Sequence, residues 1–240
     1  MRAFKYNGVD FSRWLKATPT VKAGHEMTVE TSEVPGRPGA VPLGTQTQPK
    51  TVSFFCRLRV PWSGWEQTAW LRRKLAAALY APDGAELVSP DEPGMRYKDA
   101  YMTSPGEWES MWASGSATID FTCYDPVAYG ARRSVPDASE AFAVGGTYPT
   151  WPTVTAKPTA GDGMRLVHVQ SSDFIQLEHD FDGTEEVAVD CARQLVTIDG
   201  DSAMRYLTVT SDFFRLPPGE NSFRLEGGGS VSCEWDERWL

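Results

Sequence analysis

Short stretches of alternating hydrophobic and polar residues fill the second half of the chain. Eight of them begin about ten residues apart, and turn pairs such as Asp162-Gly163 and Pro218-Gly219 separate many of them. Successive side chains of a strand point to opposite faces, so each stretch offers one face to a core and one to water. The predicted strands are Thr153–Lys157, Met164–Val169, Phe174–Glu178, Glu185–Asp190, Gln194–Ile198, Met204–Thr208, Asn221–Leu225 and Ser230–Glu234. Eight strands without a helix predict a two-sheet sandwich or jelly roll.

The first half mixes strands with one helix. Residues 51–60 (TVSFFCRLRV) and 117–124 (ATIDFTCY) alternate cleanly, which predicts two strands. Residues 65–80 (WEQTAWLRRKLAAALY) carry apolar residues at three-and-four spacing, which predicts an amphipathic helix that ends before Pro82-Asp83-Gly84. Shorter strands are predicted at 4–6, 26–31, 86–88 and 94–102. The first half is therefore expected to be a β-rich domain with a single α-helix.

Two segments do not show a regular period. Residues 32–50 carry four prolines and three glycines and exceed the length of an ordinary connection, so they are interpreted as an irregular functional loop. Residues 135–147 also lack a clean period and are interpreted as an interdomain linker. The expected organisation is a domain over 1–134, the linker, and a β-sandwich over 148–234.

Charge supports the division into two parts. The net charge is −9, with 16 basic and 14 acidic residues in 1–134, but 7 and 18 in 135–240. Phosphate contacts require Lys and Arg, so the acidic half argues against a nucleic-acid partner. No apolar stretch approaches the roughly 20 residues of a membrane span, and residues 1–10 lack the apolar core of a signal peptide. A soluble protein made in a cytoplasm is expected, with no membrane partner.

A search for reactive side chains predicts no catalytic, cofactor-binding or metal-binding residue. Three histidines are present, of which His168 lies in an alternating strand and is interpreted as a structural residue. The four cysteines form no CxxC pair and are expected to be buried free thiols. Residues 179–183 (HDFDG) resemble a fragment of a calcium loop, but the twelfth position, counted with Asp180 as the first, holds Cys191 instead of Glu. A hairpin turn explains the same residues.

Several segments together resemble the distal tail protein (Dit) family of siphophages from Gram-positive hosts. They are the turn 34–40 (VPGRPGA) after a strand, the helix near Trp65, the stretch 87–100 (LVSPDEPGMRYKDA), the strand 117–126 (ATIDFTCYDP) and the turn 212–222 (DFFRLPPGENS). Each motif alone is weakly specific, whereas their order and spacing are more specific. Pro38 departs from the family pattern, in which an acidic residue is common after the arginine.

The resemblance implies a structural virion protein at the tail tip, mainly β and without enzymatic activity. An N-terminal β-sandwich-like domain would form a ring, usually a hexamer, around the tail channel, and a galectin-like or jelly-roll β-sandwich would project outward. Residues 235–240 would return to the first domain. The implied partners are other copies of the chain, the major tail tube protein, a tail-associated hub, lysin or fibre protein and the tape measure protein.

A closed ring needs two different patches on each subunit, and the Pro/Gly-rich segment suits a reach to a neighbour. The candidate oligomerisation arm is Val34, Pro35, Gly36, Arg37, Pro38, Gly39 and Leu43. Deletion of residues 36–48 is expected to abolish oligomers and leave a folded monomer.

The alternative function is a carbohydrate-binding adhesin that recognises glycan of the host cell wall. Tyr148 and Trp151 are the candidate residues for stacking on sugars, because both are aromatic and both precede the predicted sandwich strands. The competing interpretation is that these aromatic residues belong to the core. A β-sandwich glycosidase or esterase is disfavoured, because no catalytic grouping is present in the sequence.

Overall fold

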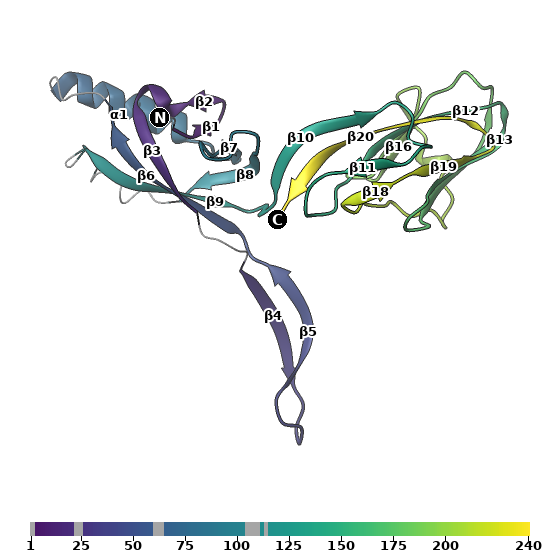
Figure 1. Ribbon diagram of the computed structural model, residues 1–240, viewed down its shortest axis with the longest axis horizontal. Helices are drawn as coiled ribbons and strands as arrows, with labels where there is room; N and C mark the ends of the chain where they lie inside the picture. Colours follow the sequence, from purple (N-terminus) through teal and green to yellow (C-terminus); the bar gives the residue numbers. More distant parts are fainter. Residues whose placement is uncertain (1–2, 22–25, 60–64, 104–110, 113–114) are drawn as a thin grey trace. The chain divides into compact units, whose positions relative to one another are not determined.

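A computed structural model describes residues 3–21, 26–59, 65–103, 111–112 and 115–240 of the 240-residue chain. The described elements fall into two compact units, residues 1–129 and 130–240, and strands dominate both (Figure 1). The mainly β fold predicted from the alternating segments is confirmed.

The first unit is built on a seven-stranded antiparallel sheet in the order β2-β1-β7-β8-β9-β6-β3. Its elements are β1 (Lys5–Tyr6), β2 (Val9–Asp10), the 3-10 helix η1 (Phe11–Arg13), β3 (Leu15–Val21), β4 (Met27–Glu33), β5 (Ala40–Thr47), β6 (Lys50–Leu58), α1 (Trp65–Leu79), β7 (Ala85–Val88), β8 (Tyr97–Met102) and β9 (Ser116–Cys123). The strands predicted at 51–60 and 117–124 are the neighbours β6 and β9, paired from Lys50 opposite Cys123 to Arg57 opposite Ser116.

Aromatic side chains form the centre of this unit. The ring of Phe4 lies 4.8 Å from those of Phe11 and Phe54 and 5.1 Å from that of Phe121, measured between centroids, and all four side chains are buried. The helix contributes Leu71, Leu75 and Leu79, which recur every four residues and are buried. The α1 prediction is therefore confirmed, together with the apolar stripe on which it rested.

The second unit is a sandwich of antiparallel sheets. One sheet has the order β10-β20-β12-β15-β16-β17, and the facing strands have the order β14-β13-β19. The elements are β10 (Ala128–Val135), β11 (Phe142–Val144), β12 (Thr153–Pro158), β13 (Gly161–His168), β14 (Phe174–Phe181), β15 (Val187–Asp190), β16 (Leu195–Ile198), β17 (Asp201–Ser202), η2 (Met204–Tyr206), β18 (Gly219–Asn221), β19 (Phe223–Glu226) and β20 (Gly229–Trp239). Buried residues of both sheets, such as Val154 and Leu166, share one core.

Three expectations about this unit need correction. Residues 135–147 are not a linker, because β11 inside them pairs with β18 and buries Phe142, while β10 lies beside β20. Residues 235–239 are the end of β20 within the second unit, where the Arg238 carbonyl accepts hydrogen bonds from the Thr147 and Tyr148 amides. The predicted strand at 204–208 is the 3-10 helix η2 followed by a single bridge between Leu207 and Leu177.

Candidate functional site

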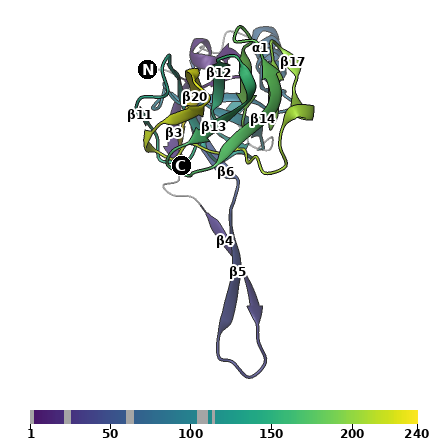
Figure 2. The ribbon, with the colours of Figure 1, turned by 90° about the vertical axis from the view of Figure 1, so that its right-hand side faces the viewer.

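The segment expected to be an irregular loop is a regular β-hairpin. Its strands β4 and β5 pair with each other from Met27 opposite Thr47 to Glu33 opposite Ala40, and they form a separate two-stranded sheet. Figures 1 and 2 show this sheet as a ribbon with no third strand alongside it. The sequence of β5 did not predict a strand, because proline and glycine interrupt its alternation. We call residues 27–47 the hairpin arm.

The tip of the arm contains six of the seven residues proposed for oligomerisation. The Arg37 amide donates a hydrogen bond to the Val34 carbonyl at 3.1 Å, which closes a turn. Gly36 and Gly39 have φ of 84° and 83°, a left-handed conformation that side chains disfavour, so glycine is required on both sides of Arg37. The seventh residue, Leu43, lies on β5 where the strand register shifts. The structure thus places all seven candidates on one arm.

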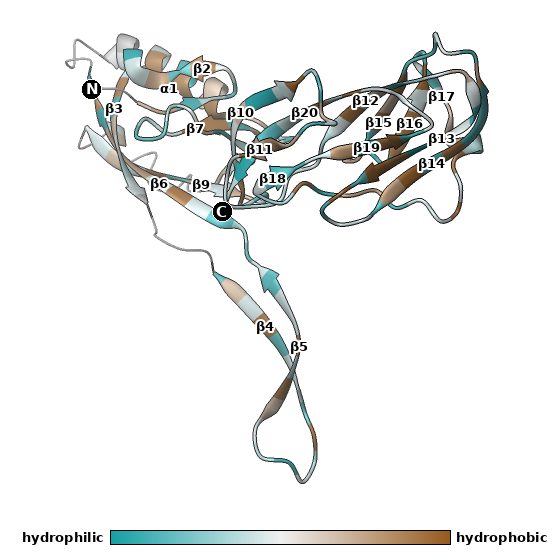
Figure 3. Cartoon of the chain, turned by 45° about the vertical axis from the view of Figure 1, so that its right-hand side comes forward, coloured by the Kyte–Doolittle hydropathy of each residue, from teal (hydrophilic) through white to brown (hydrophobic). Residues whose placement is uncertain are grey.

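Apolar side chains along the arm are exposed to solvent. The exposed fraction is 66% for Met27, 49% for Val29, 46% for Val34 and 69% for Leu43. Figure 3 shows hydrophobic and hydrophilic bands following one another along β4 and β5. A separate two-stranded sheet that exposes several large apolar residues is typical of a surface that binds a partner. Met27 and Val29 were missed as arm residues, although their alternation had already predicted the strand.

The aromatic residues proposed for glycan stacking have arginine neighbours. The Arg215 guanidinium lies 4.3 Å from the ring centroid of Trp151, which is half-buried against the core of the second unit. The Arg238 guanidinium lies 5.1 Å from the ring centroid of Tyr148. These contacts hold both rings in structural roles, and sugar binding by Tyr148 and Trp151 stays a prediction. Binding of the intact chain to a glycan array would test it.

His168 is a structural residue, as the alternation predicted. The amide nitrogen of Asn221 donates to the carbonyls of Pro217 and Gly219 at 2.9 and 3.0 Å, which turns its oxygen toward His168. His168 Nε2 donates to that oxygen at 3.0 Å, and Nδ1 accepts from the Ser171 hydroxyl at 2.8 Å. Both His168 and Asn221 are fully buried. The turn motif LPPGEN therefore ends in an asparagine because its amide holds the turn against the core.

The buried imidazole makes the second unit sensitive to acid. Burial lowers the pKa of His168, although the Asn221 hydrogen bond and the charge of Asp173 act in the opposite direction. A histidine in an unfolded chain has a pKa of about 6.5. Below that pH the unfolded chain binds a proton more readily than the folded unit does, because the pKa of His168 is lowered in the fold. The contribution of neutral His168 to the free energy of unfolding should be largest above about pH 6.5. The free energy of unfolding should therefore fall as the pH decreases below that value. Thermal unfolding between about pH 7.5 and 5 measures this slope, which His168→Gln should flatten; equal slopes in both proteins would refute the assignment.

The remaining reactive groups are used structurally. All four cysteines are free and buried, as expected, and burial raises the pKa of Cys56, Cys123 and Cys191 to about 12. In the suspected calcium loop, the Asp182 carboxylate accepts from the Thr184 amide and hydroxyl at 2.7 and 2.8 Å, which makes a turn. His25 lies outside the described residues. Among the described residues there is no cluster of three or more metal-ligating side chains and no helix long and apolar enough to cross a membrane.

Comparison with known proteins assigns both units. Residues 14–123 match the model of a phage tail protein RIFT-related domain, and residues 145–239 match that of a siphovirus-type tail component, C-terminal domain. The distal tail protein of Bacillus phage SPP1 is 26% identical over 164 residues, which span 64% of this chain and 64% of that protein, just under two thirds of its length.

One solved structure supports the fold. The crystal structure of SPP1 Dit, described as a paradigm of the hub adsorption apparatus in phages that infect Gram-positive bacteria, matches with a TM-score of 0.76 and 19% identity over 100% of both chains. A chain of the phage p2 baseplate in its activated conformation matches 98% of each chain with a TM-score of 0.47 and 11% identity. Two consecutive tail domains, a distal tail relative and the matching fold together place this chain in the distal tail protein (Dit) family of siphoviruses.

Proposed function

We propose that the chain assembles into a ring, with six copies as the expected number, that joins the tail tube to the hub of the tail tip. The observation that supports this proposal best is the hairpin arm, a two-stranded sheet that exposes apolar side chains and, among the residues that the structure describes, pairs with no other strand. Burial of apolar area stabilises association by roughly 25 cal/mol per Å², so an exposed arm of this kind favours binding to another chain.

A ring requires a contact between two different patches of neighbouring copies. The arm supplies one patch, and its β-hairpin structure means that little backbone order remains to be gained on binding, which lowers the entropic cost. The second patch belongs to the receiving subunit. Repetition of one head-to-tail contact closes a ring when the rotation between neighbours divides a full turn, whereas a contact between identical patches would stop at a dimer.

The other proposed partners follow from the place of such a ring in a tail. The tail tube protein would bind one face of the ring, and a hub, lysin or fibre protein would bind the other, with the tape measure protein near the lumen. The chain would be assembled in the host cytoplasm and would remain in the virion as a structural component. The relationship to phage tail proteins supports the virion location.

The mass of the purified chain in solution tests the proposal. Multi-angle light scattering coupled to size exclusion should give a particle of several chain masses at micromolar concentration, with six as the expected number. Dilution should shift the population from this particle toward single chains. It should not produce a continuous range of masses, because a closed ring has a defined stoichiometry. A single-chain mass at every concentration would overturn the ring, and masses that grow without limit would indicate an open filament instead.

A further inference from the structure

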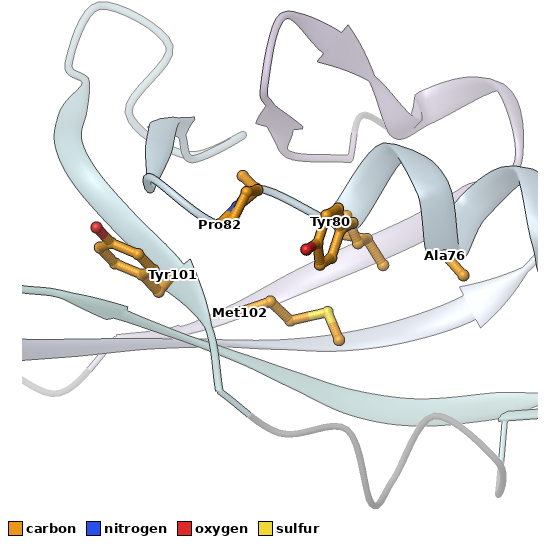
Figure 4. Close-up of a pocket in the computed structure, with 7 residues that line it drawn as sticks. Ala76, Tyr80, Pro82, Tyr101 and Met102 are labelled. Atoms are coloured by element: carbon orange, nitrogen blue, oxygen red, sulfur yellow. The ribbon is translucent and has the colours of Figure 1, made fainter.

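An apolar pocket lies at the end of α1 in the first unit. It has a volume of about 310 Å³ and is lined by Ala76, Leu79, Tyr80, Ala81, Pro82, Tyr101 and Met102 (Figure 4). The labelled side chains in Figure 4 come from the last turn of the helix, the segment that follows it and strand β8. Tyr80 forms part of the wall while 72% of its surface is exposed.

The pocket is held open by a fixed aromatic wall. The ring of Tyr101 packs edge-on against Tyr124, with centroids 5.4 Å apart. Gly84 has φ of 74°, and a Cβ on it would lie 2.8 Å from the Tyr101 ring, so a glycine is needed for the close approach of this turn. The turn after α1 and the packing of Tyr101 against Tyr124 therefore fix the position of the aromatic wall of the pocket.

A positive charge lies one helical turn away from the pocket. Arg72 and Ala76 are spaced by four residues along α1, so they lie on one stripe of the helix surface, and Tyr80 directly follows the helix. Arg72 is exposed. Along this stripe a basic residue precedes the apolar pocket. The Arg72 and Ala76 positions are about 6 Å apart along the helix axis.

The hairpin arm carries the complementary pattern. The register of the arm shifts between Glu30 opposite Gly44 and Thr31 opposite Pro42, which leaves Leu43 as the extra residue of a β-bulge. A bulged residue is turned out of the regular ladder, and Leu43 is the most exposed of the four large apolar residues on the arm. Glu30, also exposed, has Gly44 as its partner across the strands, so an acidic residue lies beside the bulged Leu43 on the arm.

We infer that Leu43 of one copy docks in the Tyr80–Tyr101 pocket of the next copy, with Glu30 facing Arg72. This inference rests on the proposed ring and names the second patch that the ring requires. The occupant is a second copy of this chain because the arm offers an exposed leucine beside an acidic residue, and the helix offers an apolar pocket beside a basic residue. Each copy carries one arm and one pocket, so the contact can repeat around a ring.

Disulfide crosslinking tests the contact directly. In the full chain with Leu43→Cys and Ala76→Cys, mild oxidation should produce a ladder of linked chains on a non-reducing gel. The native thiols do not compete, because all four are buried. The matched control combines Leu43→Cys with Thr18→Cys, an exposed position on the edge strand β3, and should yield no ladder.

The outcomes separate this inference from the proposed ring. A ladder in the test pair alone supports the docking. A ring mass by light scattering without a ladder, or with equal ladders in both pairs, overturns the docking and leaves the ring intact. A crosslink at the mass of one chain shows that the arm fills its own pocket and also overturns the inference. A single-chain mass before oxidation overturns the docking and the ring together.

Charge exchange provides a second readout. Glu30→Arg or Arg72→Glu alone should raise the concentration at half-assembly by about tenfold, since each juxtaposes like charges at the contact. The double variant should restore assembly to near the original concentration. The control pair Glu30→Arg with Lys16→Glu changes the same charges elsewhere on the unit and should not restore it. Equal behaviour of the two double variants would contradict the pairing of Glu30 with Arg72.

Discussion

Removal of the hairpin arm should convert the assembled protein entirely into folded single chains. The variant replaces residues 27–47 by Gly-Gly, which is feasible because the Gln48 amide and the Glu26 carbonyl already lie 2.8 Å apart at the base of the arm. The arm pairs with no strand of the seven-stranded sheet, so its loss should leave the core of the first unit unchanged. Light scattering should then report one chain mass at concentrations at which the intact protein forms the ring.

The deletion of 36–48 expected from the sequence is a poorer experiment now that the hairpin is known. It would remove β5 but keep β4, whose Met27 and Val29 would remain on an unpaired strand edge that favours aggregation. Removal of both strands avoids this. A matched control keeps the arm and replaces only Thr18 of β3, an exposed residue outside the arm, by Ala; it should keep the ring. A ring that persists without the arm would contradict the role given to the arm.

Replacement of Asn221 by alanine should cause the largest loss of stability. The change removes hydrogen bonds to Pro217, Gly219 and His168 at one fully buried position. Buried groups left without partners cost about 1–3 kcal/mol each, so the second unit should lose about 3 kcal/mol in its free energy of unfolding. The corresponding decrease in its midpoint temperature is roughly 10 °C or more, measured by calorimetry of the full chain.

Ser222→Ala is the matched control for this substitution. Ser222 is the next residue, and its hydroxyl accepts only an exposed hydrogen bond from Gln170 at 3.3 Å, so its loss should shift the midpoint by no more than about 2 °C. The first unit should unfold at an unchanged temperature in both variants. If Asn221→Ala and Ser222→Ala behave alike, the buried asparagine does not hold the turn in the way described.

Burial explains which parts of the fold could be predicted. Residues 51–60 alternate because Val52, Phe54 and Cys56 face the core of the first unit, and the same holds for Leu71, Leu75 and Leu79 at helical spacing. The turn Asn7-Gly8 was also predictable, since both residues adopt left-handed φ values of 50° and 72° between the paired residues Tyr6 and Val9. Where one face of a strand or helix is buried in a core, the hydrophobic pattern of its sequence predicts the element.

The arm and the linker region were misread for the opposite reason. Strand β5 has no core to face, so nothing imposes alternation on it, and Pro42 and Gly44 resemble loop residues. β11 has only three residues, too few for a period to be recognised. The alternating segment at 204–208 failed because a tertiary bridge between Leu207 and Leu177 replaced a regular ladder. The candidate residues at the arm tip lie together on one turn, whose glycines the sequence already showed, and their role in oligomerisation stays a prediction.

Electron microscopy of the purified, intact chain tests the central claim most directly. Face-on averages should show a closed ring of like subunits around an open channel, and the variant without residues 27–47 should show isolated particles of one subunit. Fields that contain only single subunits of the intact chain, at concentrations well above micromolar, would contradict a ring built by the arm.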